Sequence, residues 1–191
     1  GVLFGLYTAA VVYALGSFLE ERFPHEETPF YTAFFSSAGV EEAVKFLFLF
    51  FLIWGNRNFN EPLDGIVYGV FVSLGFAWAE NVIYVTHPIL GGYETALERA
   101  LLSVPGHGLF GVRMGYYFAL GKYRSRKRYL PLAFFSPYLA HALYNYFLLK
   151  REPVFWLFFS VLEVRLWVFG LKRIKELQNC SPFREKVSKE S

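Results

Sequence analysis

The apolar positions of the chain fall into six long runs that short polar segments separate. An α-helix needs about 20 mainly apolar residues to cross the roughly 30 Å hydrocarbon layer of a membrane, and each run approaches that length. The pattern therefore predicts an all-α fold, a polytopic transmembrane helical bundle of about six membrane-spanning helices. We place these helices near residues 2–19, 30–54, 64–85, 96–120, 129–149 and 153–171.

Composition supports a membrane protein. Of the 191 residues 54% are hydrophobic, with 23 Phe and 13 Tyr, which is more apolar and aromatic than an ordinary soluble domain. Because the sequence has no linker or repeat, we expect residues 1–171 to form one membrane-embedded domain. Residues 172–191 are expected to form a polar, cytoplasmic C-terminal tail. Its single cysteine, Cys180, has no partner for an internal disulfide.

Charge gives an orientation. The segments "KYRSRKR" and "KRIK" are basic, whereas "LEERFPHEE" is acidic. Since positive charge prefers the cytoplasmic side, both basic segments are expected there. The chain start and the loop with Arg57 then lie on the same side, and the acidic segment and the loop around Gly91 lie outside. The short "KREP" segment runs against this rule. The basic loop is interpreted as an anchor to the lipid bilayer, because no motif for nucleic-acid binding is present.

Many polar and ionisable residues fall inside the apolar runs. Each ionised group costs roughly 2.5–3.5 kcal/mol at membrane depth on insertion scales, so such groups usually face the protein interior or a water-filled cavity. The set comprises Glu41, Glu42, Lys45, Glu80, Asn81, His107, Arg113, His141, Asn145, Glu163 and Arg165.

Four of these residues come from four different helices and lie at a similar depth. At about 1.5 Å per residue, their positions fall roughly 8–18 Å below the predicted outer ends of the helices. The four are Glu42, Glu80, His107 and His141.

Spacing indicates how the side chains are directed. Glu41 and Lys45 are four residues apart and can pair, whereas Glu42 lies about 100° around the helix and can point elsewhere. Arg113 is expected to pair with a carboxylate, such as Asp64 or Glu163.

The histidines have informative neighbours. His141 and Asn145 share one helix face. Pro105 precedes His107, and because proline bends a helix, His107 is expected at a bend beside a polar cavity. Gly65, Gly69 and Gly75 are expected to permit close helix contact.

Two histidines and several glutamates at one level suit a metal such as zinc, with three protein ligands and an open position for water. A remaining glutamate could serve as general base. Simpler interpretations also exist: Glu41–Lys45 as a buried ion pair, His107 as a packing residue, and His141–Asn145 as a clamp between helices. Carboxylate-rich membrane cavities also serve transport.

Four segments, in order, resemble the PrsW family of intramembrane proteases. They are "EEAVK" from Glu41, "EPLDGIVYGVFVSLGFAWAENVIY" from Glu61, "SVPGHGLFGVRMGYYFALGK" from Ser103 and "HALYN" from His141. The resemblance implies a helical fold shared with CAAX prenyl endopeptidases and bacteriocin-processing proteins. It also implies a multi-pass protein of the prokaryotic cell membrane that cleaves a membrane-spanning protein substrate near its outer side. The best-known role of the family gives an anti-sigma factor as one candidate substrate.

The resemblance carries over the active residues Glu41, Glu42, Glu80, His107 and His141, with Lys45 and Asn145 in support. In our hypothesis His107, His141 and Glu80 (or Glu42) are the metal ligands, with zinc as cofactor. Glu41 or Glu42 deprotonates the attacking water, and Lys45 holds the other glutamate.

Asn145 donates to the oxyanion or orients His141; the family often has Asp at this position, and Asn cannot act as a base. Family members usually also have a further helix upstream of the first predicted segment.

Three alternatives stay open at this point. In a metal-free scheme, proposed for the related prenyl endopeptidases, a Glu–His pair activates water and His and Asn form the oxyanion hole. The second alternative is an ion- or proton-coupled membrane transporter that uses the same buried cluster. The third is a catalytically inactive protein that binds a membrane partner.

Overall fold

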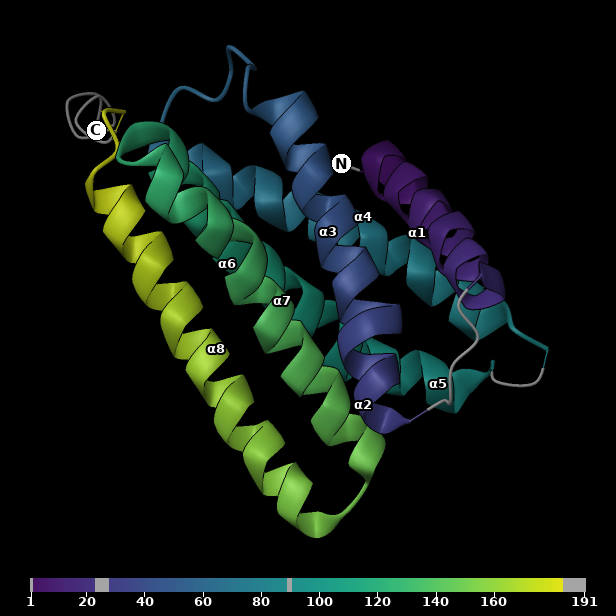
Figure 1. Cartoon of the computed structure of the whole chain (residues 1–191). Helices are drawn as coiled ribbons and strands as arrows, with labels where there is room; N and C mark the ends of the chain where they lie inside the picture. The colour runs from purple at the N-terminus through teal and green to yellow at the C-terminus, as the bar shows by residue number, and fades with distance from the viewer. Residues whose placement is uncertain (1, 23–27, 89–90, 184–191) are drawn as a thin grey trace.

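The computed structural model describes residues 2–22, 28–88 and 91–183, and within these ranges it is helical, without a β-strand (Figure 1). The elements, in chain order, are α1 (Val2–Arg22), α2 (Pro29–Tyr31), η1 (Thr32–Gly39), α3 (Val40–Phe48), η2 (Leu49–Ile53), α4 (Pro62–Thr86), α5 (Tyr93–Glu98), η3 (Arg99–Ser103), α6 (Val104–Tyr123), α7 (Arg126–Lys150) and α8 (Pro153–Asn179).

These elements form six helical stretches. The η segments are π-helical turns, and the residues at their junctions keep right-handed helical dihedral angles. Consequently α2 to η2 make one stretch, and α5 to α6 make another. Each stretch coincides with one predicted helix. The last one continues through Asn179, past the expected end at residue 171, and residues 184–191 of the predicted tail lie outside the described residues.

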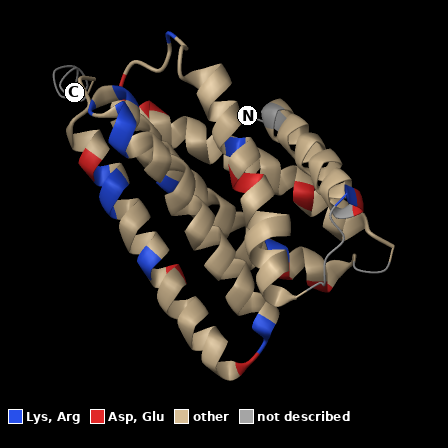
Figure 2. Ribbon diagram, viewed as in Figure 1, with Lys and Arg blue, Asp and Glu red and all other residues tan. Residues whose placement is uncertain are grey.

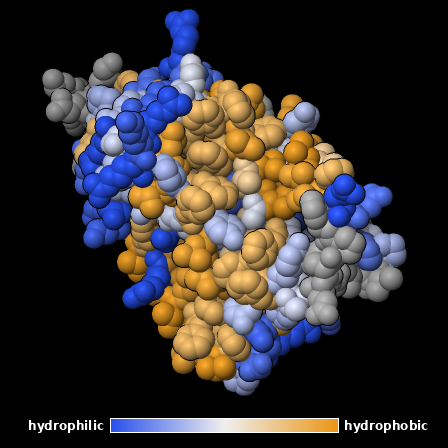
Figure 3. All heavy atoms as spheres, viewed as in Figure 1, coloured by the Kyte–Doolittle hydropathy of each residue, from blue (hydrophilic) through white to orange (hydrophobic). Residues whose placement is uncertain are grey.

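Two helices of the described chain, α4 and α8, are long and apolar enough by composition to cross a membrane. A shorter apolar helix covers Gly5–Leu19. Apolar side chains cover much of the middle of the face seen in Figure 3, and hydrophilic residues gather mainly toward its ends. Large apolar residues such as Phe51, Phe71 and Leu157 are exposed, which suits a surface that contacts lipid.

Glycines bring α4 and α6 into close contact. A methyl group on Gly69 would lie 2.5 Å from the carbonyl oxygen of Gly111, and one on Gly65 would lie 2.6 Å from that of Gly115. Gly75 of α4 meets Gly5 of α1 in the same way. The prediction of close helix contact at these glycines is confirmed, and it fixes the helix that carries Glu80 against the helix that carries His107.

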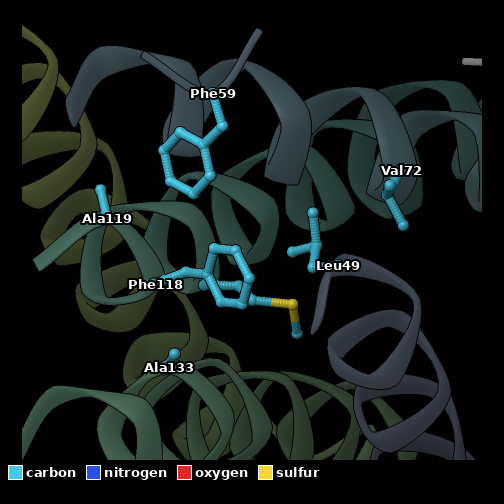
Figure 4. Close-up of a cluster of buried hydrophobic side chains, with 7 residues drawn as sticks. Leu49, Phe59, Val72, Phe118, Ala119 and Ala133 are labelled. Atoms are coloured by element: carbon cyan, nitrogen blue, oxygen red, sulfur yellow. The ribbon is translucent and has the colours of Figure 1, made fainter. Parts of the chain in front are cut away.

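One apolar cluster closes the bundle beside these helices. Phe59 stacks on Phe118 with ring centroids 5.8 Å apart, and Leu49 and Ala133 complete the packing from η2 and α7 (Figure 4). Lys122 donates to the carbonyl oxygens of Trp54 and Phe59, at 3.0 and 3.1 Å, and thereby ties the loop before α4 to the end of α6.

Basic residues gather at one end of the helical bundle. The loop between η2 and α4, the α6–α7 turn and the end of α8 lie at one end of the molecule, and the α7–α8 turn lies at the other (Figure 1). Lysines and arginines gather around the α6–α7 turn and the end of α8 (Figure 2).

The prediction that Arg113 pairs with a carboxylate was wrong. Its Nε donates to Ser136 Oγ at 2.7 Å and its guanidinium lies over the Phe169 ring. Asp64 instead accepts the backbone N–H groups of Asn60 and Glu61 at the start of α4.

Candidate active site

The acidic pair of α3 is buried around one lysine. Lys45 Nζ lies 2.8 Å from Glu42 Oε1 and 3.4 Å from Glu41 Oε2, and the side chains of Glu42 and Lys45 are inaccessible to solvent. The expected Glu41–Lys45 pair is present, but Glu42 does not point elsewhere. Residues three apart are also neighbours on a helix, so the long lysine side chain reaches both carboxylates. Their burial is tolerated because the charges are paired.

A wide helical turn positions His107. The N–H of Val104 bonds to the carbonyl oxygen of Arg99, the five-residue spacing of a π-turn, and Pro105 follows at once. Proline cannot donate a backbone bond, and π-turns are frequent at functional sites. His107 thus follows an irregular turn of helix, and it lines a cavity with polar residues, as predicted.

The contacts of His107 indicate which of its ring nitrogens carries the hydrogen. Nδ1 lies 3.1 Å from Lys45 Nζ, and Nε2 lies 3.1 Å from Glu80 Oε2. An ammonium group can only donate, so Nδ1 is the acceptor and Nε2 carries the hydrogen that it donates to Glu80.

α7 contributes His141 and Asn145. His141 Nδ1 lies 2.9 Å from Glu42 Oε1, and Asn145 Nδ2 lies 3.1 Å from His141 Nε2. The amide N–H donates to Nε2, so Nδ1 carries the hydrogen and donates to the carboxylate. Asn145 Nδ2 also donates to Ser37 Oγ at 2.9 Å, and Ser37 donates to Glu41 Oε1 at 2.9 Å. The polar groups of three helical stretches thus form one connected network.

Glu80 belongs to a second group of contacts at the edge of this network. Arg99 Nη2 lies 2.6 Å from Glu80 Oε2 and 3.0 Å from Ser103 Oγ. Arg99 Nε lies 2.6 Å from Asn81 Oδ1, and the guanidinium lies 4.2 Å from the centre of the Tyr84 ring. Sequence reasoning did not select Arg99. Two features of the sequence could have indicated it: Arg99 is four residues before Ser103, and it lies in the helix that follows the one with Glu80.

The site opens to a cavity of about 690 Å³. Glu80, Arg99, His107, His141 and Asn145 contribute to its polar side, and its apolar side includes Leu102, Leu148 and Trp156. Glu41, Glu42 and Lys45 are buried behind this wall.

The donor set fits a metal ion. Glu41, Glu42, His107 and His141 each offer a ligand atom, and these atoms all lie within 4.8 Å of one another. Glu42 Oε2 is buried and has no hydrogen-bond partner in the described part of the chain. Carboxylate oxygens and imidazole nitrogens are ligands that zinc accepts. Lys45 places its ammonium group among the same donors and supplies positive charge there.

All seven residues predicted for the site lie in these contacts. Glu41, Glu42, His107 and His141 form the tightest group, with Lys45 inside it. Asn145 contacts His141, and Glu80 is joined to the group by its contact with His107.

Fold and site together define a helical membrane protein with a buried carboxylate–histidine centre. The family described as PrsW family intramembrane metalloprotease matches residues 1–170, and the chain belongs to this family. The relative named Protease PrsW from Geobacillus kaustophilus is 40% identical over 152 residues, which is 78% of this chain and 65% of the relative. Those from Oceanobacillus iheyensis and Bacillus subtilis are 41% and 37% identical, over 76% and 78% of this chain and 67% and 68% of the relatives. The chain thus spans about two thirds of the length of these relatives. No solved structure matches it.

Proposed function

We propose that the chain is an intramembrane endopeptidase that hydrolyses a peptide bond of a membrane-anchored protein. The observation that carries this proposal is the buried group of Glu41, Glu42, His107 and His141, whose ligand atoms lie within 4.8 Å of one another beside a cavity. The names of the relatives add support, since each is called a protease. A transporter is not favoured, because the family is one of metalloproteases.

His107, His141 and Glu42 would hold the metal, which we propose to be zinc. Glu42 offers an oxygen without a partner in the described part of the chain, and ligand atoms of Glu42, of His107 from α6 and of His141 from α7 lie within 4.8 Å of one another. When bound, zinc lowers the pKa of a coordinated water to about 7 and polarises a carbonyl group. Of the two glutamates considered as third ligand, we choose Glu42 over Glu80, because Glu80 is not among the four residues whose ligand atoms lie within 4.8 Å of one another.

Glu41 is the residue that we assign as general base. Its Oε1 accepts a hydrogen bond from Ser37, which lines the cavity, so it lies on the side from which water enters. A carboxylate there takes the proton of the attacking water and later returns it to the leaving amine.

Two neighbours support this chemistry. Lys45 offsets the negative charge of Glu41 and Glu42, to which it is bonded. Asn145 is a neighbour of His141 and has an amide group beside the cavity that can donate to a developing oxyanion.

We place the protein in the bacterial cell membrane as a multi-pass protein of about six spans, with residues 1–171 as its protease domain. The lysines and arginines of the α6–α7 turn and the end of α8 favour a cytoplasmic position for that end and for residues 172–191. The cavity includes residues of the α7–α8 turn at the opposite end, such as Arg151, so it opens outward. The substrate is then cut near the outer side of the membrane, and a membrane-spanning anti-sigma factor is one candidate.

The test is cleavage of single-span substrates by the purified protein in liposomes. Wild type should release the outer part of a substrate, and Glu41→Gln should not. Glu94→Gln, which changes an exposed glutamate of α5, is the matched control and should cleave normally. Proton flux without any cleavage would favour the transporter and contradict the proposal.

A further inference from the structure

Arg99 is the most extensively bonded cation at the cavity that the proposed chemistry does not use. Its side chain is 16% exposed and lines the cavity at the first residue of η3. We propose that Arg99 is a positioning residue, which acts through Glu80 to fix the ring of His107. This inference rests on the proposed function for its kinetic consequence, but its structural part is independent of it.

One carboxylate oxygen joins the two side chains. Glu80 Oε2 lies 2.6 Å from Arg99 Nη2 and 3.1 Å from His107 Nε2. Since Nε2 carries the hydrogen, the same oxygen accepts from both residues. The position of that oxygen therefore sets the direction in which the imidazole ring can donate.

Arg99 is itself held in place from three sides. Its Nε donates to Asn81 and its Nη2 donates to Ser103, while the guanidinium plane lies over Tyr84. A guanidinium has five N–H donors in a fixed planar arrangement, and a lysine in its place has no such plane. The contacts thus specify an arginine at this position and not simply a positive charge.

The consequence is a defined orientation of His107. With Nε2 directed to Glu80, Nδ1 faces Lys45 and, through it, Glu41 and Glu42. Histidines at metal centres commonly donate their other N–H to a carboxylate, which fixes the tautomer and the ring. Glu80 is the carboxylate that accepts this N–H from His107, so we assign it as a positioning residue and not as a ligand.

The tautomer of His107 gives a readout that does not depend on cleavage. Protein labelled with ¹⁵N-histidine, without added metal, is compared by NMR with Arg99→Lys and Arg99→Gln, and His107→Gln assigns the signal. Wild type should show the Nε2–H tautomer of His107. Arg99→Gln should show a mixture of tautomers, because a ring that Glu80 no longer holds can turn and accept from Lys45 through Nε2, with its hydrogen on Nδ1. Arg99→Lys should recover part of the wild-type signature. Arg113→Gln, which removes a half-buried arginine of α6 bonded to Ser136, is the control and should leave the signal unchanged.

The same variants are assayed for cleavage. Loss of such an outer partner typically costs about 10–100-fold in metal affinity or activity, so kcat should fall by that factor in Arg99→Gln while KM changes little. A lower kcat with an unchanged tautomer would overturn the inference, as would a mixed tautomer with a normal kcat. If Arg99→Gln does not fold, Asn81→Leu removes one anchor of Arg99 and should give a smaller shift in the same direction. A wild type that cleaves nothing would refute the proposed function, while the tautomer result would still decide the role of Arg99.

Discussion

Lys45 Nζ lies 3.1 Å from Nδ1 of His107, 62 residues further along the chain. The same ammonium group bonds both glutamates of its own helix. A buried lysine therefore stands at the centre of the group of carboxylates and imidazoles, where it supplies the positive charge that two buried carboxylates require.

Removal of this charge should destabilise the fold. Breaking a buried pair by removal of one partner costs about 3–5 kcal/mol, because the other charge stays buried, and Lys45→Met is expected to fall in this range. Thermal unfolding in detergent checks this. The double variant Lys45→Met/Glu42→Gln removes one of the two stranded carboxylates and should recover part of the loss. Equal stability of wild type and Lys45→Met would mean that the pairing makes no net contribution to the stability of the fold.

The metal content separates the two chemical schemes. Protein purified without a His-tag or chelator should contain about one zinc per chain by elemental mass spectrometry, as expected for a single catalytic site. His107→Ala/His141→Ala should lose the metal. His87→Ala, which changes a histidine outside the group, should retain it. Wild type that cleaves a substrate but holds no metal would establish the Glu–His scheme, in which Lys45 is the resident cation.

The six helical stretches and the convergence of the site could be predicted from the sequence. The length of each apolar run fixed the helices, and the depth count brought together Glu42, His107 and His141, which the structure places in one group. Both predictions depend on properties of a single helix, namely its length and its rise per residue.

The errors concern the partners of individual side chains. Glu42 bonds to Lys45 of its own helix although we expected it to point elsewhere, and Arg113 donates to Ser136 of α7 in place of a carboxylate. The contact of Glu80 with Arg99 was not predicted. A helical wheel shows where a side chain leaves its own helix but not which neighbour arrives from another. The partners depend on the rotation and close approach of the helices, which the glycines of α4 and α6 set.

Gly69 should be intolerant of any side chain. Its added methyl group would lie 2.5 Å from the Gly111 carbonyl oxygen, so Gly69→Ala must separate α4 from α6 and displace Glu80 from His107. We expect overpacking to cost about 1–3 kcal/mol and to reduce cleavage. Gly16→Ala in α1 is the control, because its methyl group would meet no atom within 4 Å. Thermal unfolding and the cleavage rate check both variants, and a fully active Gly69→Ala would show that the two helices can separate without loss.

Two serines should respond in opposite ways to the same substitution. Ser37 Oγ accepts from Asn145 and donates to Glu41, so Ser37→Ala leaves polar groups without a partner beside the cavity. That substitution should lower the free energy of unfolding by about 1–3 kcal/mol and slow cleavage. Ser73 Oγ is buried without a hydrogen-bond partner in the described chain.

Ser73→Ala therefore removes a hydroxyl group whose burial is unfavourable, and the remaining methyl group keeps the packing of α4. The thermal midpoint of Ser73→Ala should equal or exceed that of wild type, at an unchanged cleavage rate. A clear loss of stability in this variant would indicate that the hydroxyl has a partner, such as a buried water. The pair then distinguishes a serine that serves the network from one that does not, although both lie in apolar helices.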